Sequence, residues 1–332
     1  MYLSKQVNNT GWKELILKIL PFLGVNGFCR QITRGQPRIL MFHKVYPEGE
    51  HHAYSDYIEL ELFERLIAYL SRYFQLVTLR DLCHFKERHG YYPDHTVVIT
   101  FDDGFKSFAD YVFPILARYH VPATLFICPA LISSGQLIWP EQVFHAYENN
   151  CLEMEPGANV EQWVASLKSL SQRDRNEELA KRIHVDHLNV FEVNDSNKEL
   201  LCWNELRDLC VSDLLEIGSH SLNHPILAHE GDHQAKTEIE GSKRLIENEL
   251  GQDVTSFCYP NGLQGDFLER DWQLVKSSGY SAAVSSMPGV VCKTSNPFSL
   301  PRLGGDFSSF AQARKYVDGV ETIQRRIMGE GI

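Results

Sequence analysis

Short apolar runs alternate with amphipathic helical patterns along most of this chain, and that alternation constrains the fold more than any other feature. The first run starts at Pro37, after a Gly/Pro signal, and has the composition of a buried parallel strand. Seven strand-like runs are present: PRILMFHKV, FQLVTL, HTVVITF, PATLFIC, LLEIG, TSFCY and YSAAVS. Because helical segments join most of them, we predict an α/β protein whose parallel sheet closes, or nearly closes, into a barrel.

The length of 332 residues is compatible with two domains of about 150 residues each or with one barrel that carries additions. Between Trp139 and Trp203 the pattern becomes helical and highly charged, which predicts a helical insertion over about residues 140–200. We therefore predict an N-terminal helical extension over 1–36, a catalytic barrel over 37–310 and a C-terminal helix or tail over 311–332. The candidate site residues extend from His43 to Arg302, so a boundary near the middle of the chain would divide the site.

Charge and cysteine content narrow the class of protein. The chain has 32 basic and 43 acidic residues, a net charge of −11, and no run of five basic residues, which disfavours a nucleic-acid-binding protein. The eight cysteines are scattered without a C-x-x-C pair, so we expect free thiols in a reducing compartment.

The segment Trp12–Phe28 is rich in apolar residues, but Lys18 and Pro21 interrupt it and no small-residue cleavage site follows. We expect neither a signal peptide nor a transmembrane helix. An amphipathic helix packed on the domain is predicted, with a helix on the membrane surface as the alternative. The expected location is cytoplasmic, with peripheral contact with the inner membrane or a lipid-linked glycan as a further expectation.

Four strand ends carry polar residues suited to catalysis, at the edge where active sites of α/β barrels gather. These residues are His43, the pair Asp102 and Asp103, the pair His220 and His224, and the loop Tyr259-Pro260-Asn261-Gly262. The two adjacent carboxylates can reach a common site only through a turn, which Gly104 permits. One can then hold a metal while the other accepts a proton from metal-bound water. An Asx turn that caps the next helix is the structural alternative.

The segment EIGSHSLNHP places His220 and His224 four residues apart directly after a strand, so one turn can direct both imidazoles at one ion. With a single aspartate they form a two-histidine, one-carboxylate set with open coordination positions. Such a set suits Zn²⁺ or another divalent ion that lowers the pKa of a bound water to about 7. Surface histidines that share this spacing by chance are the alternative, and His229 and His233 are expected to be solvated.

Three ordered segments resemble successive motifs of the polysaccharide deacetylases, the NodB-homology or carbohydrate esterase family 4 enzymes. They are TFDDG (100–104), SHSLNHP (219–225) and FCYPNG (257–262), and with their flanking text the resemblance covers about Arg38 to Leu303. The resemblance implies a deformed (β/α)7 barrel with a helical insertion. It also implies metal-dependent hydrolysis of an N-acetyl group, or of an O-acetyl or N-formyl group, on a sugar.

Matching the motifs position by position implies a role for each residue. Asp103, His220 and His224 would bind the metal, and Asp102 would be the general base. Ser221 lies where the family has a Ser or Thr that steadies the loop, and the backbone N–H near Asn261 matches the usual oxyanion donor. The loop Tyr259–Gly262 as a whole is expected to contact the substrate or the oxyanion.

The chain departs from the family pattern at two places. Cys258 stands where the arginine that holds the base is expected, and Asn261 replaces a tyrosine. Arg302, in the strand-like SLPRLGG, is a candidate for the missing cation, with a plain surface arginine as the alternative. The late Leu-x-His motif that carries the general acid is also absent.

His43 is the candidate for the missing acid. MFHKV is similar to the first strand of a subgroup that includes poly-N-acetylglucosamine deacetylases of bacterial biofilms, in which a histidine there provides the acid. This resemblance implies that protonated His43 donates to the leaving amine, with a buried structural histidine as the alternative.

The expected function is removal of an N-acetyl group, with release of acetate, from an N-acetylated sugar, a polysaccharide or a precursor of surface polysaccharide. The expected cofactor is Zn²⁺, with Co²⁺, Ni²⁺ or Mn²⁺ as alternatives, and the sequence indicates no oligomeric state. An allantoinase-like amidohydrolase acting on a small nitrogenous substrate is one alternative, and a catalytically silent glycan-binding module is another. Retention of both aspartates and both histidines argues against these two alternatives.

Overall fold

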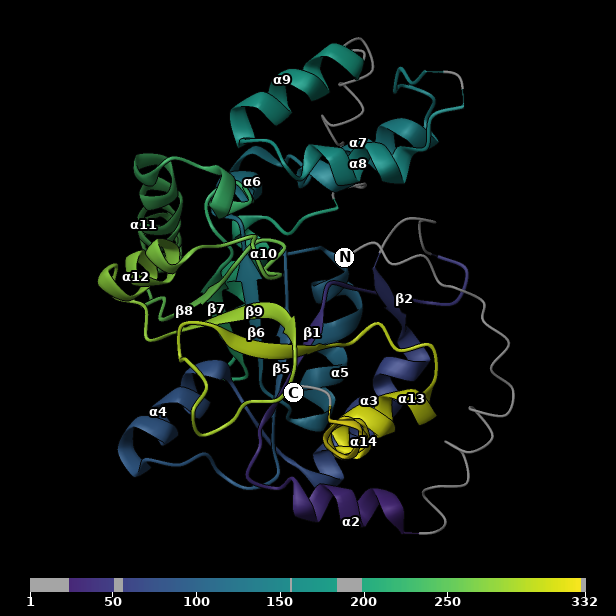
Figure 1. Ribbon diagram of the computed structural model, residues 1–332, viewed down its shortest axis with the longest axis vertical. Helices are drawn as coiled ribbons and strands as arrows, with labels where there is room; N and C mark the ends of the chain where they lie inside the picture. The colour runs from purple at the N-terminus through teal and green to yellow at the C-terminus, as the bar shows by residue number, and fades with distance from the viewer. Residues whose placement is uncertain (1–23, 51–55, 156, 184–198, 330–332) are drawn as a thin grey trace.

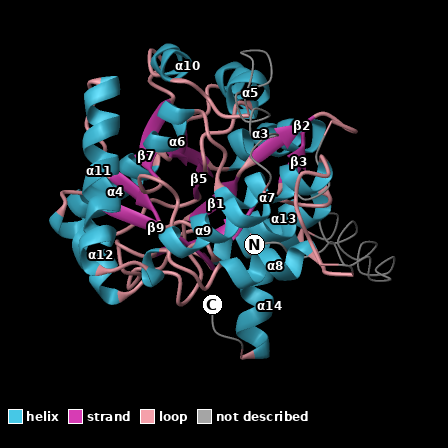
Figure 2. Ribbon diagram, turned by 90° about the horizontal axis from the view of Figure 1, so that it is seen from above, coloured by secondary structure: helices cyan, strands magenta, loops and turns pink. Residues whose placement is uncertain are grey.

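A closed ring of parallel strands forms the centre of the computed structural model, which describes residues 24–50, 56–155, 157–183 and 199–329 (Figure 2). β1 (Arg38–Phe42) pairs with β10 (Leu300–Gly304) on one side and with β5 (Thr96–Phe101) on the other. The ring is completed by β6 (Ala123–Ile127), β7 (Leu215–Ser219), β8 (Ser256–Cys258) and β9 (Ala282–Pro288). The predicted α/β barrel of seven strands is therefore confirmed.

One strand of the ring differs from the seven runs counted in the sequence. FQLVTL forms β4 (Gln75–Val77), which pairs only with the first half of β5 and lies outside the ring. Its place in the ring is taken by β10, in which Pro301 and Arg302 interrupt the apolar pattern and weaken the strand signal. A second, two-stranded parallel sheet, β2 (Lys44–Tyr46) with β3 (Tyr57–Glu59), continues from β1.

Helices surround the ring and connect its strands (Figure 1). α3 (Leu60–Tyr73) buries Leu62, Phe63, Leu66, Ile67 and Leu70, the face that its apolar spacing predicts. The predicted helix after TFDDG begins with a π-helical turn, η2 (Phe108–Val112), and continues as α5 (Phe113–Tyr119). Among the described residues, the other helices outside the charged segment are α2 (Val25–Ile32), α4 (Leu79–His89), α6 (Pro129–Ser134), α10 (Trp203–Leu209), η5 (Leu227–His229), α11 (Asp232–Leu250), α12 (Glu269–Ser277), α13 (Phe310–Val317) and α14 (Val320–Met328).

The interior of the ring contains an apolar layer that closes one of its ends. Ile39, Val98, Phe126, Val284 and Leu300 belong to this layer, which also includes Leu79 and Leu82 of α4. The first residues of α4 donate backbone hydrogen bonds to side chains at the starts of β6 and β7. α4 thus covers the N-terminal ends of the strands, and the C-terminal ends remain available for a site.

Three helices between β6 and β7 pack together above the ring at the top of Figure 1. They are α7 (Trp139–Glu148), α8 (Val160–Leu167) and α9 (Gln172–Arg182), and they share a small apolar core that includes Val143, Val164 and Leu179. We propose that they are the helical insertion predicted for residues 140–200, of which 184–198 lie outside the described residues.

Most of the predicted amphipathic segment Trp12–Phe28 also lies outside the described residues, which begin at Gly24. Over the described ranges of the chain, no helix combines the length and the apolar character needed to cross a membrane.

Candidate active site

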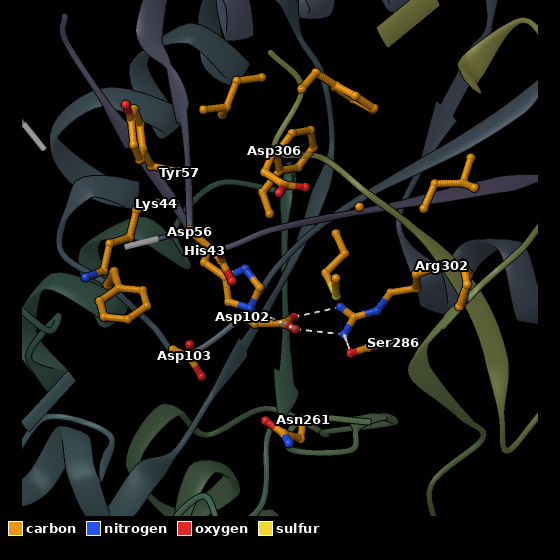
Figure 3. Close-up of a pocket in the computed structure, with 18 of the residues that line it drawn as sticks. His43, Lys44, Asp56, Tyr57, Asp102, Asp103, Asn261, Ser286, Arg302 and Asp306 are labelled. Atoms are coloured by element: carbon orange, nitrogen blue, oxygen red, sulfur yellow. Dashed lines mark hydrogen bonds and ion pairs between the residues drawn. The ribbon is translucent and has the colours of Figure 1, made fainter. Parts of the chain in front are cut away.

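The alternation of side chains along each strand determines which polar residues enter the barrel. Val98 and Leu300 face the interior layer, so Asp102 and Arg302, displaced from them by even numbers of positions, face the same way. His43 follows Ile39 by the same rule at the end of β1. Figure 3 shows His43, Asp102 and Arg302 converging from three strand ends on one cavity.

Arg302 binds Asp102 through a two-pronged ion pair. Its Nη1 lies 2.8 Å from Oδ1 and its Nη2 lies 2.7 Å from Oδ2 of the carboxylate. Arg302 Nε also donates to the Ser285 carbonyl at 2.9 Å, which fixes the plane of the guanidinium. Burial opposes the charged form of Asp102, but the adjacent guanidinium outweighs it and holds the pKa of Asp102 well below its usual range. Arg302 is 1% exposed, so the alternative of a plain surface arginine is wrong.

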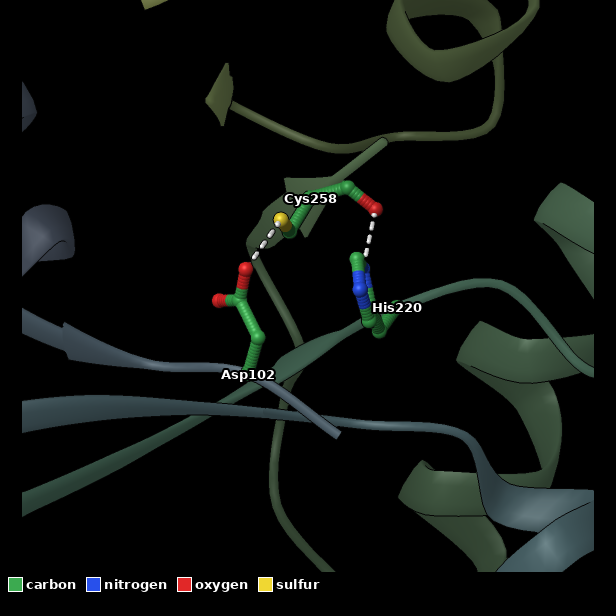
Figure 4. Close-up of side chains that lie close together, drawn as sticks. All are labelled: Asp102, His220 and Cys258. Atoms are coloured by element: carbon green, nitrogen blue, oxygen red, sulfur yellow. Dashed lines mark hydrogen bonds between the residues drawn. The ribbon is translucent and has the colours of Figure 1, made fainter. Parts of the chain in front are cut away.

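Cys258 lies beside Asp102 (Figure 4) and also contacts Arg302, at the position where the family pattern would have an arginine. Its Sγ is 3.1 Å from Arg302 Nη2 and 3.5 Å from Asp102 Oδ2. Burial raises the pKa of the Cys258 thiol well above its usual range, so the thiol stays protonated. Because the Cys258 side chain is small, the guanidinium of Arg302 has room to take the place of the expected cation.

Asp103, His220 and His224 form a buried cluster with the donor atoms of a metal site. Asp103 Oδ1 is 3.4 Å from Nε2 of each histidine, and all three residues are buried. Asp103 has a φ of 73° and Gly104 a φ of 77°, which is the turn that separates the two carboxylates. The Nδ1 of His220 donates to the Cys258 carbonyl at 2.8 Å, and this leaves Nε2 as the ligand atom.

The residues of this cluster fit a divalent cation. Asp103 Oδ1 is buried without a hydrogen-bond partner, although it faces two imidazole nitrogens. Burial, and then the charge of Asp102, raise the pKa of Asp103 well above its usual range. Burial lowers the pKa of His220 to about 4, so its imidazole is neutral and available as a ligand. A cation bound here would give a partner to the Asp103 carboxylate and to the nitrogen lone pairs of both imidazoles.

Asp102, His220 and Cys258 form a second cluster of close donor atoms. The guanidinium of Arg302 already contacts two members of this cluster, Asp102 and Cys258. The site therefore has one place suited to a metal ion, around Asp103, and a second where an arginine supplies the positive charge.

His43 lies at the edge of the cavity, with Nε2 4.0 Å from Asp102 Oδ2 and a side chain that is 27% exposed. Burial lowers the pKa of His43, and the charge of Asp102 offsets part of that effect. The partial exposure of His43 and its contact with the cavity argue against the alternative that it is a purely structural, buried histidine.

The loop after β8 contributes less to the cavity than predicted. Asn261 lines the cavity, and Gly262 has a φ of 68° and so little space that a Cβ would lie 2.8 Å from Ser286 N. Tyr259, in contrast, is buried, stacks on Phe267 and donates from its hydroxyl to the Phe298 carbonyl at 2.9 Å. A substrate contact through the Tyr259 side chain is therefore wrong, and Pro260 is likewise buried and does not line the cavity.

The cavity has a volume of about 510 Å³ and includes residues that sequence reasoning missed. They are Glu141 and five residues labelled in Figure 3, namely Lys44, Asp56, Tyr57, Ser286 and Asp306. Lys44 Nζ lies 2.8 Å from Glu141 Oε2 and 4.3 Å from the centre of the Phe105 ring. The sequence carries no signal for this contact, because it joins β2 to α7 across nearly a hundred residues.

The fold and the site together are those of an α/β-barrel enzyme with a candidate metal centre. Residues 89–283 match the family model described as polysaccharide deacetylase, and the chain belongs to this family. It is 33% identical over 86 residues to a poly-β-1,6-N-acetyl-D-glucosamine N-deacetylase of Staphylococcus epidermidis. That match spans 24% of this chain and 29% of the relative.

Solved structures share the fold at lower sequence identity. The deacetylase PplD of Streptococcus pyogenes, in complex with acetate, has a TM-score of 0.58 at 17% identity and covers 84% of this chain and 97% of its own. IcaB of Ammonifex degensii has a TM-score of 0.59 at 16% identity and covers 86% of this chain and 97% of its own. These likenesses agree with the barrel predicted from the motifs.

Proposed function

We propose that this protein hydrolyses the N-acetyl group of an N-acetylglucosamine-containing polysaccharide, or of its precursor, and releases acetate. One observation carries the proposal: the Arg302-bound carboxylate of Asp102 and the Asp103–His220–His224 cluster border the same cavity, with His43 at its edge. The substrate follows the name of the Staphylococcus epidermidis relative, of which this chain matches only a part.

Each residue has a part in this proposal. Asp103, His220 and His224 would hold a divalent ion, with Zn²⁺ expected, and the ion when bound would supply Lewis-acid polarisation of the acetyl carbonyl and of water. Asp102, kept ionised by Arg302, accepts the proton of the attacking water. Protonated His43 donates to the leaving nitrogen, because an amide nitrogen leaves poorly without a proton. The backbone of Asn261 contributes to the oxyanion site.

Acetate release tests the proposal. Purified protein should release acetate from β-1,6-linked N-acetylglucosamine oligomers, and a chelator should abolish the release until a divalent ion is restored. A parallel panel contains other N-acetylated oligosaccharides, lipid-linked sugars, nucleotide sugars and allantoin. Oligomer binding without acetate release would instead indicate a silent glycan-binding module, and turnover of allantoin alone would indicate the related amidohydrolase.

We further infer that the N-terminal region contacts a membrane surface, and that the protein acts in the cytoplasm on a lipid-linked precursor. α2 exposes Phe28 and Ile32, one helical turn apart, and it continues the apolar segment that starts at Trp12. Co-sedimentation with phosphatidylglycerol vesicles tests the membrane contact. Serine substitutions at both positions should reduce binding, and equal binding by the variant would contradict the contact.

A further inference from the structure

The loop that carries both candidate histidine ligands has an unfavourable backbone. Ser221 has a φ of 63° and His224 a φ of 60°, and both are side-chain-bearing residues in the left-handed region. Such conformations cost free energy and persist only where surrounding contacts determine them. Inside the loop, the backbone N–H of His224 donates to Ser221 Oγ at 3.1 Å. This single contact leaves the middle of the loop, Leu222 and Asn223, to be held from outside.

Glu238 of α11 supplies that support. One carboxylate oxygen, Oε2, accepts hydrogen bonds from the backbone N–H groups of both Leu222 and Asn223 at 2.9 Å each. The other oxygen, Oε1, accepts from Asn223 Nδ2, also at 2.9 Å. Glu238 is fully buried, with an exposed fraction of 0%. A buried charged acceptor makes stronger hydrogen bonds than an exposed or neutral one, so the three bonds fix this stretch firmly.

A carboxylate suits this position because it can accept four hydrogen bonds at once. Gln234, one turn earlier on α11, donates the fourth, from Nε2 to Glu238 Oε1 at 3.2 Å. A glutamine side chain would offer only one accepting oxygen and would turn a donor toward the remaining N–H groups. Loss of the carboxylate would leave the N–H groups of Leu222 and Asn223 without a protein partner in this arrangement.

We propose that Glu238 is a positioning residue for the metal centre: it fixes Leu222 and Asn223, midway between the two ligands, so that His220 and His224 converge on Asp103. The proposal rests on the metal set of the proposed function but not on the substrate. It extends the candidate site to a helix that contributes no ligand.

Metal affinity measures this role directly. The experiment compares the wild type with Glu238→Ala and Glu238→Gln, using Co²⁺ and Zn²⁺ in competition with a chromophoric chelator. Gln234→Ala is the matched control, because it removes a hydrogen bond to the same carboxylate but none from the loop. The absorption spectrum of the Co²⁺ protein reports the ligand geometry, and the Tm of the metal-free protein reports folding separately.

Glu238→Ala should weaken the affinity for both ions about 10- to 100-fold and change the Co²⁺ spectrum. Glu238→Gln should give a smaller loss, and Gln234→Ala should stay within about twofold of wild type. A purely structural role would lower the Tm of the metal-free protein while leaving affinity and spectrum unchanged.

A folded Glu238→Ala protein with wild-type affinity and spectrum would overturn the proposal. If that variant does not fold, the same result for Glu238→Gln would overturn it. A wild-type protein that binds no Co²⁺ or Zn²⁺ would overturn the metal set and this proposal together. A wild type that binds metal but releases no acetate would overturn only the proposed reaction, since these measurements use no substrate.

Discussion

Arg302 donates one hydrogen bond to each carboxylate oxygen of Asp102, although the two residues are 200 positions apart in the chain. The pair is possible because β10 and β5 flank β1 in the ring, so their ends meet at the same side of the cavity. Both side chains are buried, with exposures of 0% and 2%. Each charge therefore depends on the other for its stability.

Replacing Arg302 by methionine should lower both activity and stability. Without the guanidinium, Asp102 loses two hydrogen bonds and its role as an ionised base, so we expect kcat to fall about 100-fold. The free energy of unfolding should fall by about 3 to 5 kcal/mol, since one partner of a buried pair is removed. Acetate release and urea denaturation measure the two effects. Arg302→Lys should lie between the variant and wild type, and full activity of Arg302→Met would disprove the role of the pair.

Cys258→Arg should be destabilising rather than a return to the family pattern. The new guanidinium would enter a space 3.1 Å from Arg302 Nη2, where two buried like charges would share one carboxylate. We expect the free energy of unfolding to fall by about 4 kcal/mol or more. In the double variant Cys258→Arg/Arg302→Ala, part of this stability and some activity should return. A double variant less stable than both single variants would contradict this account, and Cys258→Ala is the control for the loss of the thiol.

The sequence predicted those features that depend on local spacing. The alternation of apolar runs with helical patterns predicts the barrel. Residues at strand ends, such as Asp102 and His220, can be recognised in the sequence because they are polar residues that follow apolar segments. The strand-like run around Arg302 makes it a candidate, but its burial depends on the pairing of β1 with β10. The order of strands in the ring is a property of the whole chain.

Contacts between distant elements could not be predicted. Glu238 lies in a long charged helix, where its spacing from Ala235 and Ser242 places it on the buried face, unlike the half-buried Glu240. That spacing does not identify the backbone N–H groups of Leu222 and Asn223 as its partners. Tyr259 belongs to a motif-like loop, but the direction of its side chain is set by Phe267 and the Phe298 carbonyl. Such partners are brought together by packing, which leaves no periodic trace in the sequence.

Substitution of the two adjacent aspartates should separate metal binding from catalysis. Asp103→Ala should lower the affinity for Zn²⁺ by more than about 100-fold and abolish the rise in Tm that the ion gives the wild type. Asp102→Asn should keep the metal and lose activity, because Asp102 is bound to Arg302 and not to the cluster. Metal analysis after gel filtration, together with Tm measurements, distinguishes the two variants. Loss of metal in Asp102→Asn would mean that the two aspartates have exchanged roles.

His43 should titrate below the ordinary histidine value of about 6.5 in the metal-free protein. Burial lowers its pKa, the charges of Asp102 and Asp56 raise it, and Arg302 lowers it further. Asp102→Asn removes one of the two raising charges, so the pKa of His43 should fall further in that variant. The ring proton signal in NMR measures both values, and a rise in the variant would contradict the assignment. His43→Ala should retain metal and lose turnover.

The ion pair of Lys44 and Glu141 joins α7 to the wall of the cavity, and we expect it to stabilise the protein. The two atoms are 2.8 Å apart, and the side-chain exposures are 1% and 15%. Glu141→Gln should lower the free energy of unfolding by about 2 kcal/mol, because it removes a carboxylate from a buried ammonium. It should also raise KM more than it lowers kcat, since Glu141 lines the cavity but has no part in the proposed proton transfers. The pair of Lys181 and Glu178 on α9 is the control, because solvent screens it, so Glu178→Gln should change stability much less than Glu141→Gln. Equal effects of the two substitutions, measured by urea denaturation, would show that burial of the Lys44 pair contributes nothing.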